Sequence, residues 1–67
     1  MKLSGRNKLT GVVKEIKLGN VMAEVIIEAG PYQVVSAITR GSVEEMELKV
    51  GDNVTALIKS TSVMVMK

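Results

Sequence analysis

One stretch decides the fold of this chain, VMAEVIIEAGPYQVVSAIT at residues 21–39. Residues 21–29 place apolar side chains at every second position, as a strand with one buried face does. Gly30-Pro31 is a strong chain breaker, and residues 32–39 resume the alternation. The stretch therefore predicts a β-hairpin whose turn lies at the Gly-Pro pair. The residues expected to share a face are Val21, Ala23, Val25 and Ile27 in the first strand, and Val34, Ser36 and Ile38 in the second.

The sequence on both sides of this hairpin predicts three more strands. Residues 9–18 carry an imperfect period-two pattern, and residues 54–59 alternate regularly after a turn at residues 50–52. Residues 63–66, Val-Met-Val-Met, are apolar on both faces. A strand of this kind needs cover on both sides, so we expect it either between two sheets or paired with another subunit.

A short helix is predicted before the fourth strand. Ser42 and Glu45 have the spacing of a capping box, with Ser42 as the N-cap of one or two helical turns. Glu44 and Glu45 then fall in the first turn of this helix. Five short strands with one inserted helix predict an all-β fold, a small five-stranded OB-like Greek-key barrel. Residues 1–67 are expected to form this barrel as a single domain.

The composition excludes several classes of function. The chain has neither Cys nor His, so it offers no thiol nucleophile, no histidine base and no ordinary zinc or haem site. We therefore expect no enzyme activity, no cofactor and no metal held as a free cation. No stretch approaches the roughly 18 apolar residues of a membrane span, which predicts a cytoplasmic protein without membrane contact.

The hydrophobic content predicts self-association. Of the 67 residues, 46% are hydrophobic, although a domain this small has little interior in which to bury them. Partner copies are the natural place for the surplus, so we expect a homo-oligomer. The net charge is only +2 and Tyr32 is the single aromatic residue, which disfavours nucleic acid as a partner. An OB-type nucleic-acid binder is nevertheless kept as one hypothesis for the function.

Two clusters near the chain ends combine a cation with small donors. They are SGRN at residues 4–7 and KSTS at residues 59–62. Neither cluster contains a carboxylate, and their guanidinium, ammonium, hydroxyl and backbone N–H groups suit a fully deprotonated oxyanion. From residue types alone, solvated surface cations at Arg6 and Lys59, with turn hydroxyls beside them, explain the clusters equally well.

Seven segments spread along the chain carry a further pattern. They are SGRN at 4–7, Leu9, GVV at 11–13, SV at 42–43, VGD at 50–52, ALIKST at 56–61 and VM at 63–64. In this order they resemble the molbindin or Mop family of small molybdate-binding proteins, which share their fold with TOBE domains. The resemblance covers essentially the whole chain. Gly5 stands where the family more often has Ala, a change that keeps the backbone N–H.

The resemblance implies a function, an assembly and a set of ligands. It implies a cytoplasmic homo-hexamer, a trimer of dimers, that holds molybdate or tungstate at subunit interfaces for molybdenum storage or buffering. The residues that match the family's oxyanion ligands are Ser4, Gly5, Arg6, Thr39, Ser42, Lys59 and Ser60. Asn7 is assigned to holding the loop, and a second class of oxyanion site lies on a symmetry axis in the family. A regulatory or assembly module without a storage role is the alternative.

Physical chemistry bears on these assignments independently. Arg6 and Lys59 together would neutralise a dianion, and Thr39 and Ser42 precede a predicted helix N-terminus, which favours anions. Ser42 is also typical of a plain N-cap and Thr39 of an ordinary strand. Because the clusters lack a carboxylate acceptor, we expect the site to reject phosphate, part of which is protonated. We expect the two terminal clusters to meet across a subunit boundary.

Overall fold

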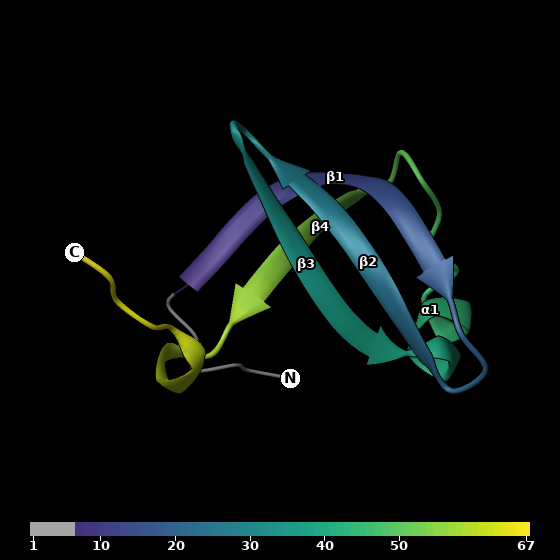
Figure 1. Ribbon diagram of the computed structural model, residues 1–67. Coiled ribbons are helices and arrows are strands. Elements are labelled where there is room, and N and C mark those ends of the chain that lie inside the picture. The colour runs from purple at the N-terminus through teal and green to yellow at the C-terminus, as the bar shows by residue number, and fades with distance from the viewer. Residues whose placement is uncertain (1–6) are drawn as a thin grey trace.

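Four antiparallel strands form one curled sheet in the structure, a computed structural model that describes residues 7–67. The elements are β1 (Asn7–Leu18), β2 (Met22–Ala29), β3 (Tyr32–Thr39), α1 (Arg40–Glu45), β4 (Asn53–Ile58) and the 3-10 turn η1 (Ser60–Ser62). The strands are ordered β3-β2-β1-β4 across the sheet. This order is a Greek key, because the fourth strand returns to lie beside the first. Figure 1 shows the sheet curling until β3 crosses in front of β4, with α1 at one end.

The hairpin predicted from residues 21–39 is confirmed. β2 pairs antiparallel with β3, and Ala29 lies opposite Tyr32 across a two-residue turn. Gly30, the first turn residue, has a φ of +61°. Glycine adopts this conformation with little cost, which is why it suits the first position of such hairpin turns.

The core lies between the inner face of the sheet and α1. Its buried members are Val13, Ala23, Val25, Ile27, Val43 and Ala56. Val34 and Ile38 pack against this cluster from β3, as their alternation predicted. Val21 was expected on the buried face of the first strand, but its side chain is 72% exposed. The difference arises because β2 begins at Met22 and leaves Val21 in the preceding connection.

β1 is a long strand that pairs with two partners in succession. Its first half pairs with β4, from Asn7 opposite Ile58 to Val12 opposite Asn53. Its second half pairs with β2, beginning with Val12 opposite Glu28. One continuous strand therefore joins the two halves of the sheet.

A β-bulge at Lys14 interrupts the second half of β1. The pairing register shifts between Val13 and Glu15, so that one residue of β1 has no partner in β2. In a regular strand, residues three positions apart lie on opposite faces. Because of the register shift, Val13 and Ile16 instead face the same core: Val13 is buried, and Ile16 packs against it. The bulge explains why the pattern of residues 9–18 alternates imperfectly.

Gly11 is buried where β1 passes from β4 to β2. A Cβ atom at this position would overlap the main-chain carbonyl oxygen of Glu28 and lie 2.8 Å from Cγ2 of Ile27. Any side chain here would push the two strands apart. The close approach of β1 to β2 therefore requires glycine.

α1 begins earlier than the sequence predicted. Its first residue is Arg40 and its N-cap is Thr39, whose side chain accepts a hydrogen bond from the Ser42 backbone N–H. Ser42, the predicted N-cap, is therefore inside the helix, and Glu44 and Glu45 lie in its last turn. Two hydroxyl residues, Thr39 and Ser42, could each cap the helix. The prediction was wrong because it chose Ser42, the one that has a Glu three residues later as the capping box requires.

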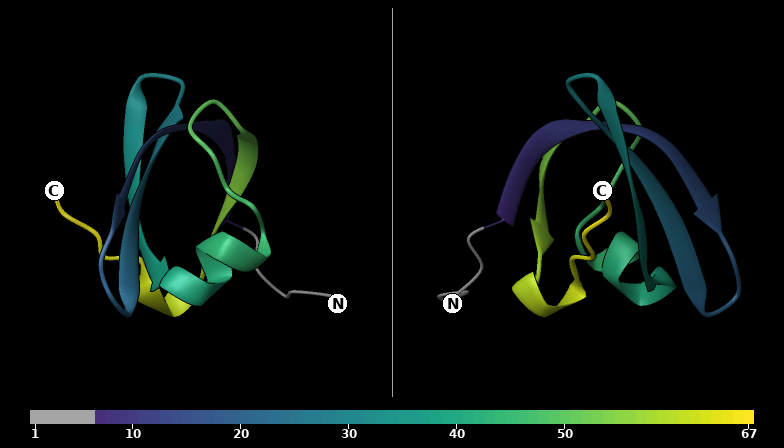
Figure 2. Two further views of the ribbon diagram at one scale, coloured as in Figure 1. Left: turned by 90° about the vertical axis from the view of Figure 1, so that its right-hand side faces the viewer. Right: turned by 60° about the vertical axis from the view of Figure 1, so that its left-hand side comes forward.

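The predicted fifth strand is not observed in the described part of the chain. Residues 63–67 have no regular secondary structure, and the sheet formed within residues 7–67 has four strands. After β4 the chain enters η1, where the Ser62 backbone N–H donates to the Lys59 carbonyl. The sheet therefore keeps two edges, β3 and β4, and Figure 2 shows it as an arch.

Replacing Gly11 by alanine tests the close approach of the strands. Gly11→Ala is expected to lower the free energy of unfolding by about 1–3 kcal/mol, because overpacking forces the backbones apart. Gly41→Ala is the control, since a Cβ there meets nothing within 4 Å. Urea unfolding followed by circular dichroism measures both variants. An unchanged midpoint in Gly11→Ala would show that the crossing tolerates a side chain.

Two hydroxyl deletions test the position of the helix cap. Thr39→Ala removes the side-chain acceptor of the Ser42 N–H and is expected to lower the free energy of unfolding by about 1 kcal/mol. Ser42→Ala keeps that cap and is expected to cost less. Thermal unfolding by circular dichroism compares the two variants. A larger loss in Ser42→Ala would return the cap to Ser42.

Candidate oxyanion site

Thr39 and Ser42 form a hydroxyl pair at the junction of β3 and α1. Thr39 Oγ1 lies 2.7 Å from Ser42 Oγ and also accepts a hydrogen bond from the Ser42 backbone N–H at 3.1 Å. Each hydroxyl carries one proton, and one of the two protons is used between them. The pair therefore keeps one O–H group that is able to donate to a ligand.

Arg40 is next to this pair in sequence, but its charge is already matched. Its Nε donates to Glu44 Oε1 at 2.9 Å, and its Nη1 donates to the Gly19 carbonyl at 3.3 Å. The contact with Gly19 ties α1 to the connection between β1 and β2, whereas Glu44 belongs to α1 itself. An anion at the hydroxyl pair would need a cation from elsewhere.

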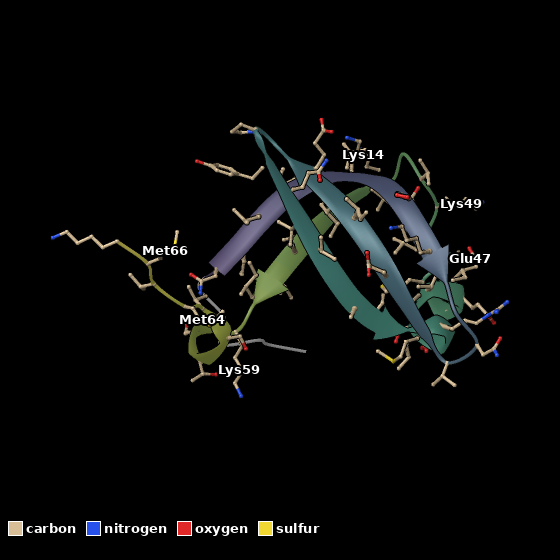
Figure 3. All side chains as sticks on the ribbon, viewed as in Figure 1. Lys14, Glu47, Lys49, Lys59, Met64 and Met66 are labelled. Atoms are coloured by element: carbon tan, nitrogen blue, oxygen red, sulfur yellow. The ribbon has the colours of Figure 1, made fainter. Side chains whose placement is uncertain are left out.

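Lys59 and Ser60 directly follow β4. Lys59 is the N-cap residue of η1, Ser60 is the first residue of that turn, and both are exposed. Within residues 7–67, Lys59 forms no salt bridge. Figure 3 shows its side chain extending outward below η1. Its ammonium group is therefore free of a described carboxylate partner.

The first terminal cluster lies mostly outside the described residues. Ser4, Gly5 and Arg6 belong to that part of the chain, and Asn7 is the first residue described. Asn7 lies opposite Ile58, the residue before the second cluster. Only Asn7 of the first cluster is therefore placed beside the end of β4. The meeting of the two clusters across a subunit boundary stays a prediction, because the other three residues of the first cluster lie outside the described residues.

The hydroxyl pair and Lys59 lie far apart in one chain. Thr39 lies opposite Met22, beyond the end of β1, whereas Lys59 follows the strand that pairs with the start of β1. β1 is 12 residues long, and Figure 1 places α1 and η1 on opposite sides of the molecule. The structure brings Thr39 to Ser42 and Lys59 to Ser60, but it does not bring these two pairs together.

An apolar groove between the two sheet edges was not predicted from the sequence. It has a volume of about 530 Å³ and is lined by β2, β3, β4, the segment after α1, and Lys59 and Ser62 at η1. Residues of its walls include Ile27, Val34, Ile38, Leu48, Val54 and Ile58. The regular alternation of residues 32–39 and 54–59 was the available signal. This alternation indicates which side chains of the two strands face the inside of the sheet, but it does not show whether another strand covers them.

The charged side chains outside these regions have ordinary surface roles. Lys14 lies 3.6 Å from Glu28 and Lys17 lies 3.9 Å from Glu24, as exposed ion pairs between β1 and β2. The described part of the chain contains no group of three or more acidic, His or Cys side chains suited to a metal ion. No helix among the same residues is long and apolar enough to cross a membrane.

Comparison with known proteins places the chain among sequence relatives of nearly equal length. The TOBE domain matches residues 3–65. Molybdenum-pterin-binding protein 1 of Clostridium pasteurianum is 46% identical over 67 residues, which make up 98% of each chain. The similarity therefore extends over both terminal clusters and the hairpin between them.

Solved structures agree in fold as well as in sequence. A molybdate-binding protein from Sporomusa ovata has a TM-score of 0.95 and 49% identity, with 100% of both chains covered. The cytoplasmic molybdate-binding protein ModG, in a form with molybdate bound, has a TM-score of 0.83 and 41% identity over 90% of this chain and 43% of its own. These matches confirm the resemblance that the terminal motifs carried, and the chain belongs to the TOBE domain family, in its molbindin (Mop) branch.

Proposed function

We propose that this protein binds the tetrahedral oxyanions molybdate and tungstate between subunits, and that it stores or buffers molybdenum in the cytoplasm. The observation that carries the proposal is the similarity over the full chain to the molybdate-binding protein from Sporomusa ovata. ModG, a relative described as cytoplasmic, supports the location. The role is binding, without a catalytic step, and neither nucleic acid nor a membrane is a proposed partner.

The charges of the candidate residues suit a dianion. Molybdate carries two negative charges, and Arg6 with Lys59 supplies two positive ones, so the bound ion is not left uncompensated. Lys59 is free of carboxylates among residues 7–67, which leaves its ammonium available to a ligand. Charge-assisted hydrogen bonds contribute about 1.5–3 kcal/mol each, and a handful of them reaches the roughly 8 kcal/mol of micromolar binding.

The separation of the candidate ligands supports a site between subunits. Arg40, the cation next to the Thr39–Ser42 hydroxyl pair in sequence, is engaged by Glu44. Lys59 supplies a cation but too few hydrogen-bond donors, because one ammonium group cannot contact all four oxygens of a tetrahedral ion. Contact between the hydroxyl pair of one subunit and the terminal clusters of another satisfies both. The full proposed ligand set is Ser4, Gly5, Arg6, Thr39, Ser42, Lys59 and Ser60.

The assembly proposed for this function is a homo-hexamer built as a trimer of dimers, each subunit a single domain of residues 1–67. Fourteen large hydrophobic side chains within the described residues are at least 40% exposed. Monomers rarely leave so much large apolar surface in water. A second class of oxyanion site on a symmetry axis belongs to the same proposal.

A titration with four oxyanions tests the function. Isothermal titration of sulfate-free protein is expected to give dissociation constants of about micromolar or below for molybdate and tungstate. Phosphate is expected to bind at least about tenfold more weakly, because its remaining proton finds no carboxylate acceptor among the proposed ligands. Sulfate completes the series. Molybdate binding weaker than about millimolar would overturn the storage role and favour a regulatory or assembly module.

Removal of a single ammonium group tests the site. Lys59→Ala is expected to weaken molybdate binding by about 10- to 150-fold, the equivalent of one charge-assisted hydrogen bond. Lys14→Ala is the matched control, because it removes the same charge from an exposed pair with Glu28. Isothermal titration at one ionic strength measures both. Equal weakening in the two variants would indicate non-specific attraction of the anion.

Ser42→Ala extends this test to the hydroxyl pair. The variant keeps the helix cap at Thr39, so its melting temperature is expected to change little while molybdate binding weakens. An unchanged dissociation constant would remove the hydroxyl pair from the site.

A further inference from the structure

Arg40 connects α1 to the sheet at two points. Its backbone N–H donates to the Val21 carbonyl at 2.8 Å, and its side-chain Nη1 donates to the Gly19 carbonyl at 3.3 Å. Both acceptors belong to the connection between β1 and β2, which Figure 1 shows beside α1. A single residue at the start of the helix is therefore held by main-chain and side-chain contacts to the same connection.

The connection is a tight turn and gives these contacts a fixed support. The Gly19 backbone N–H donates to the Met22 carbonyl at 2.8 Å. A Cβ atom on Gly19 would lie 2.8 Å from the same oxygen, which is too close for a real side chain, so the turn requires glycine. Met22 in turn lies opposite Thr39. The turn therefore ends beside the residue that caps α1.

Glu44 and the turn together fix the plane of the Arg40 guanidinium. Arg40 Nε donates to Glu44 Oε1 at 2.9 Å, one helical turn further along α1. A guanidinium is planar and holds its N–H donors in a rigid fork, so the carboxylate at Nε and the carbonyl at Nη1 leave it one orientation. A lysine ammonium would keep the charge but has no such fork. The arrangement therefore depends on arginine and not on the positive charge alone.

The Thr39–Ser42 hydroxyl pair depends on the position of this short helix. α1 has only six residues, too few to be stable by itself, and Val43 is its single buried residue. Arg40 lies between the two hydroxyl residues in sequence, so a shift of the first turn would change both side-chain directions. The Arg40 side chain is 44% exposed, and exposed ion pairs add little to the stability of a fold. Its contacts therefore affect where the pair lies more than whether the chain folds.

We propose that Arg40 is a positioning residue of the oxyanion site, which holds the Thr39–Ser42 pair in the orientation that meets the ion. This inference rests on the proposed function and adds a residue that the ligand set does not contain. Arg40 does not bind the ion itself, because its guanidinium is directed to Glu44 and Gly19. Ligands that are already ordered reduce the cost of binding. Loss of the Arg40 contacts therefore weakens binding although every proposed ligand is still present.

Two replacements of Arg40 separate positioning from attraction by its charge. Arg40→Ala removes both the charge and the fork, whereas Arg40→Lys keeps the charge and loses the fork. Both variants are expected to weaken molybdate binding by about 3- to 10-fold in isothermal titration, the cost of ordering one or two side chains at the site. If Arg40→Lys binds molybdate as tightly as the unsubstituted protein, the charge alone is sufficient and the proposal is overturned.

Lys17→Ala is the matched control. Lys17 lies 3.9 Å from Glu24 in an exposed ion pair, two residues before Gly19. Its replacement removes one cation near the same turn without touching the Arg40 contacts, so molybdate binding is expected to stay unchanged. Thermal unfolding without ligand completes the comparison, and the Arg40 variants are expected to melt at the same temperature as the control. A clearly lower melting temperature would assign Arg40 to the stability of the fold and overturn the proposal.

Amide hydrogen exchange tests the same contacts without any oxyanion. The Ser42 backbone N–H donates to Thr39 Oγ1, so its exchange rate reports how often the hydroxyl pair opens. Exchange at this amide is expected to be at least about threefold faster in Arg40→Ala and unchanged in Lys17→Ala. Equal rates in both variants would overturn the proposal. If the unsubstituted protein binds no oxyanion, the proposed function fails, and the exchange rates still decide whether Arg40 holds the pair.

Discussion

The close approach of Gly11 to the Glu28 carbonyl is the constraint on which the rest of the structure depends. Without a side chain at this point, β1 passes from β4 to β2 as one continuous strand and joins the two halves of the sheet. The bulge at Lys14 then keeps Val13 and Ile16 on the inner side and increases the local twist. The sheet consequently curls until its edges, β3 and β4, border one groove.

The β2–β3 hairpin was predictable because its signals are local, namely alternation in both arms and a Gly-Pro turn between them. The start of α1 was not, since Thr39 and Ser42 both have side chains that cap helices. A contact between distant segments accompanies the observed start: the Arg40 backbone N–H donates to the Val21 carbonyl. Because Arg40 and Val21 are far apart in the sequence, no local sequence pattern predicts that hydrogen bond. The bulge in β1 escaped prediction for the same reason, because it exists only relative to β2.

The candidate ligands could be chosen from the sequence by residue type, but their grouping could not. Lys59 and Ser60 are neighbours, and Thr39 lies one helical turn before Ser42, so local structure alone forms these two pairs. The position of Asn7 next to the second cluster depends on pairing between β1 and β4, which brings the first described residue opposite Ile58. The proposed contact between the hydroxyl pair and the terminal clusters would come from a second copy, for which the sequence offers only its surplus of apolar residues.

A site between subunits would couple ligand binding to assembly. A ligand that binds only the assembled state stabilises it by about 2.7 kcal/mol at a hundredfold excess over its dissociation constant. Burial of the exposed apolar side chains between subunits would stabilise the same state without ligand. Assembly of this kind would position the proposed ligands before the ion arrives, and less of the binding energy would be used to order them.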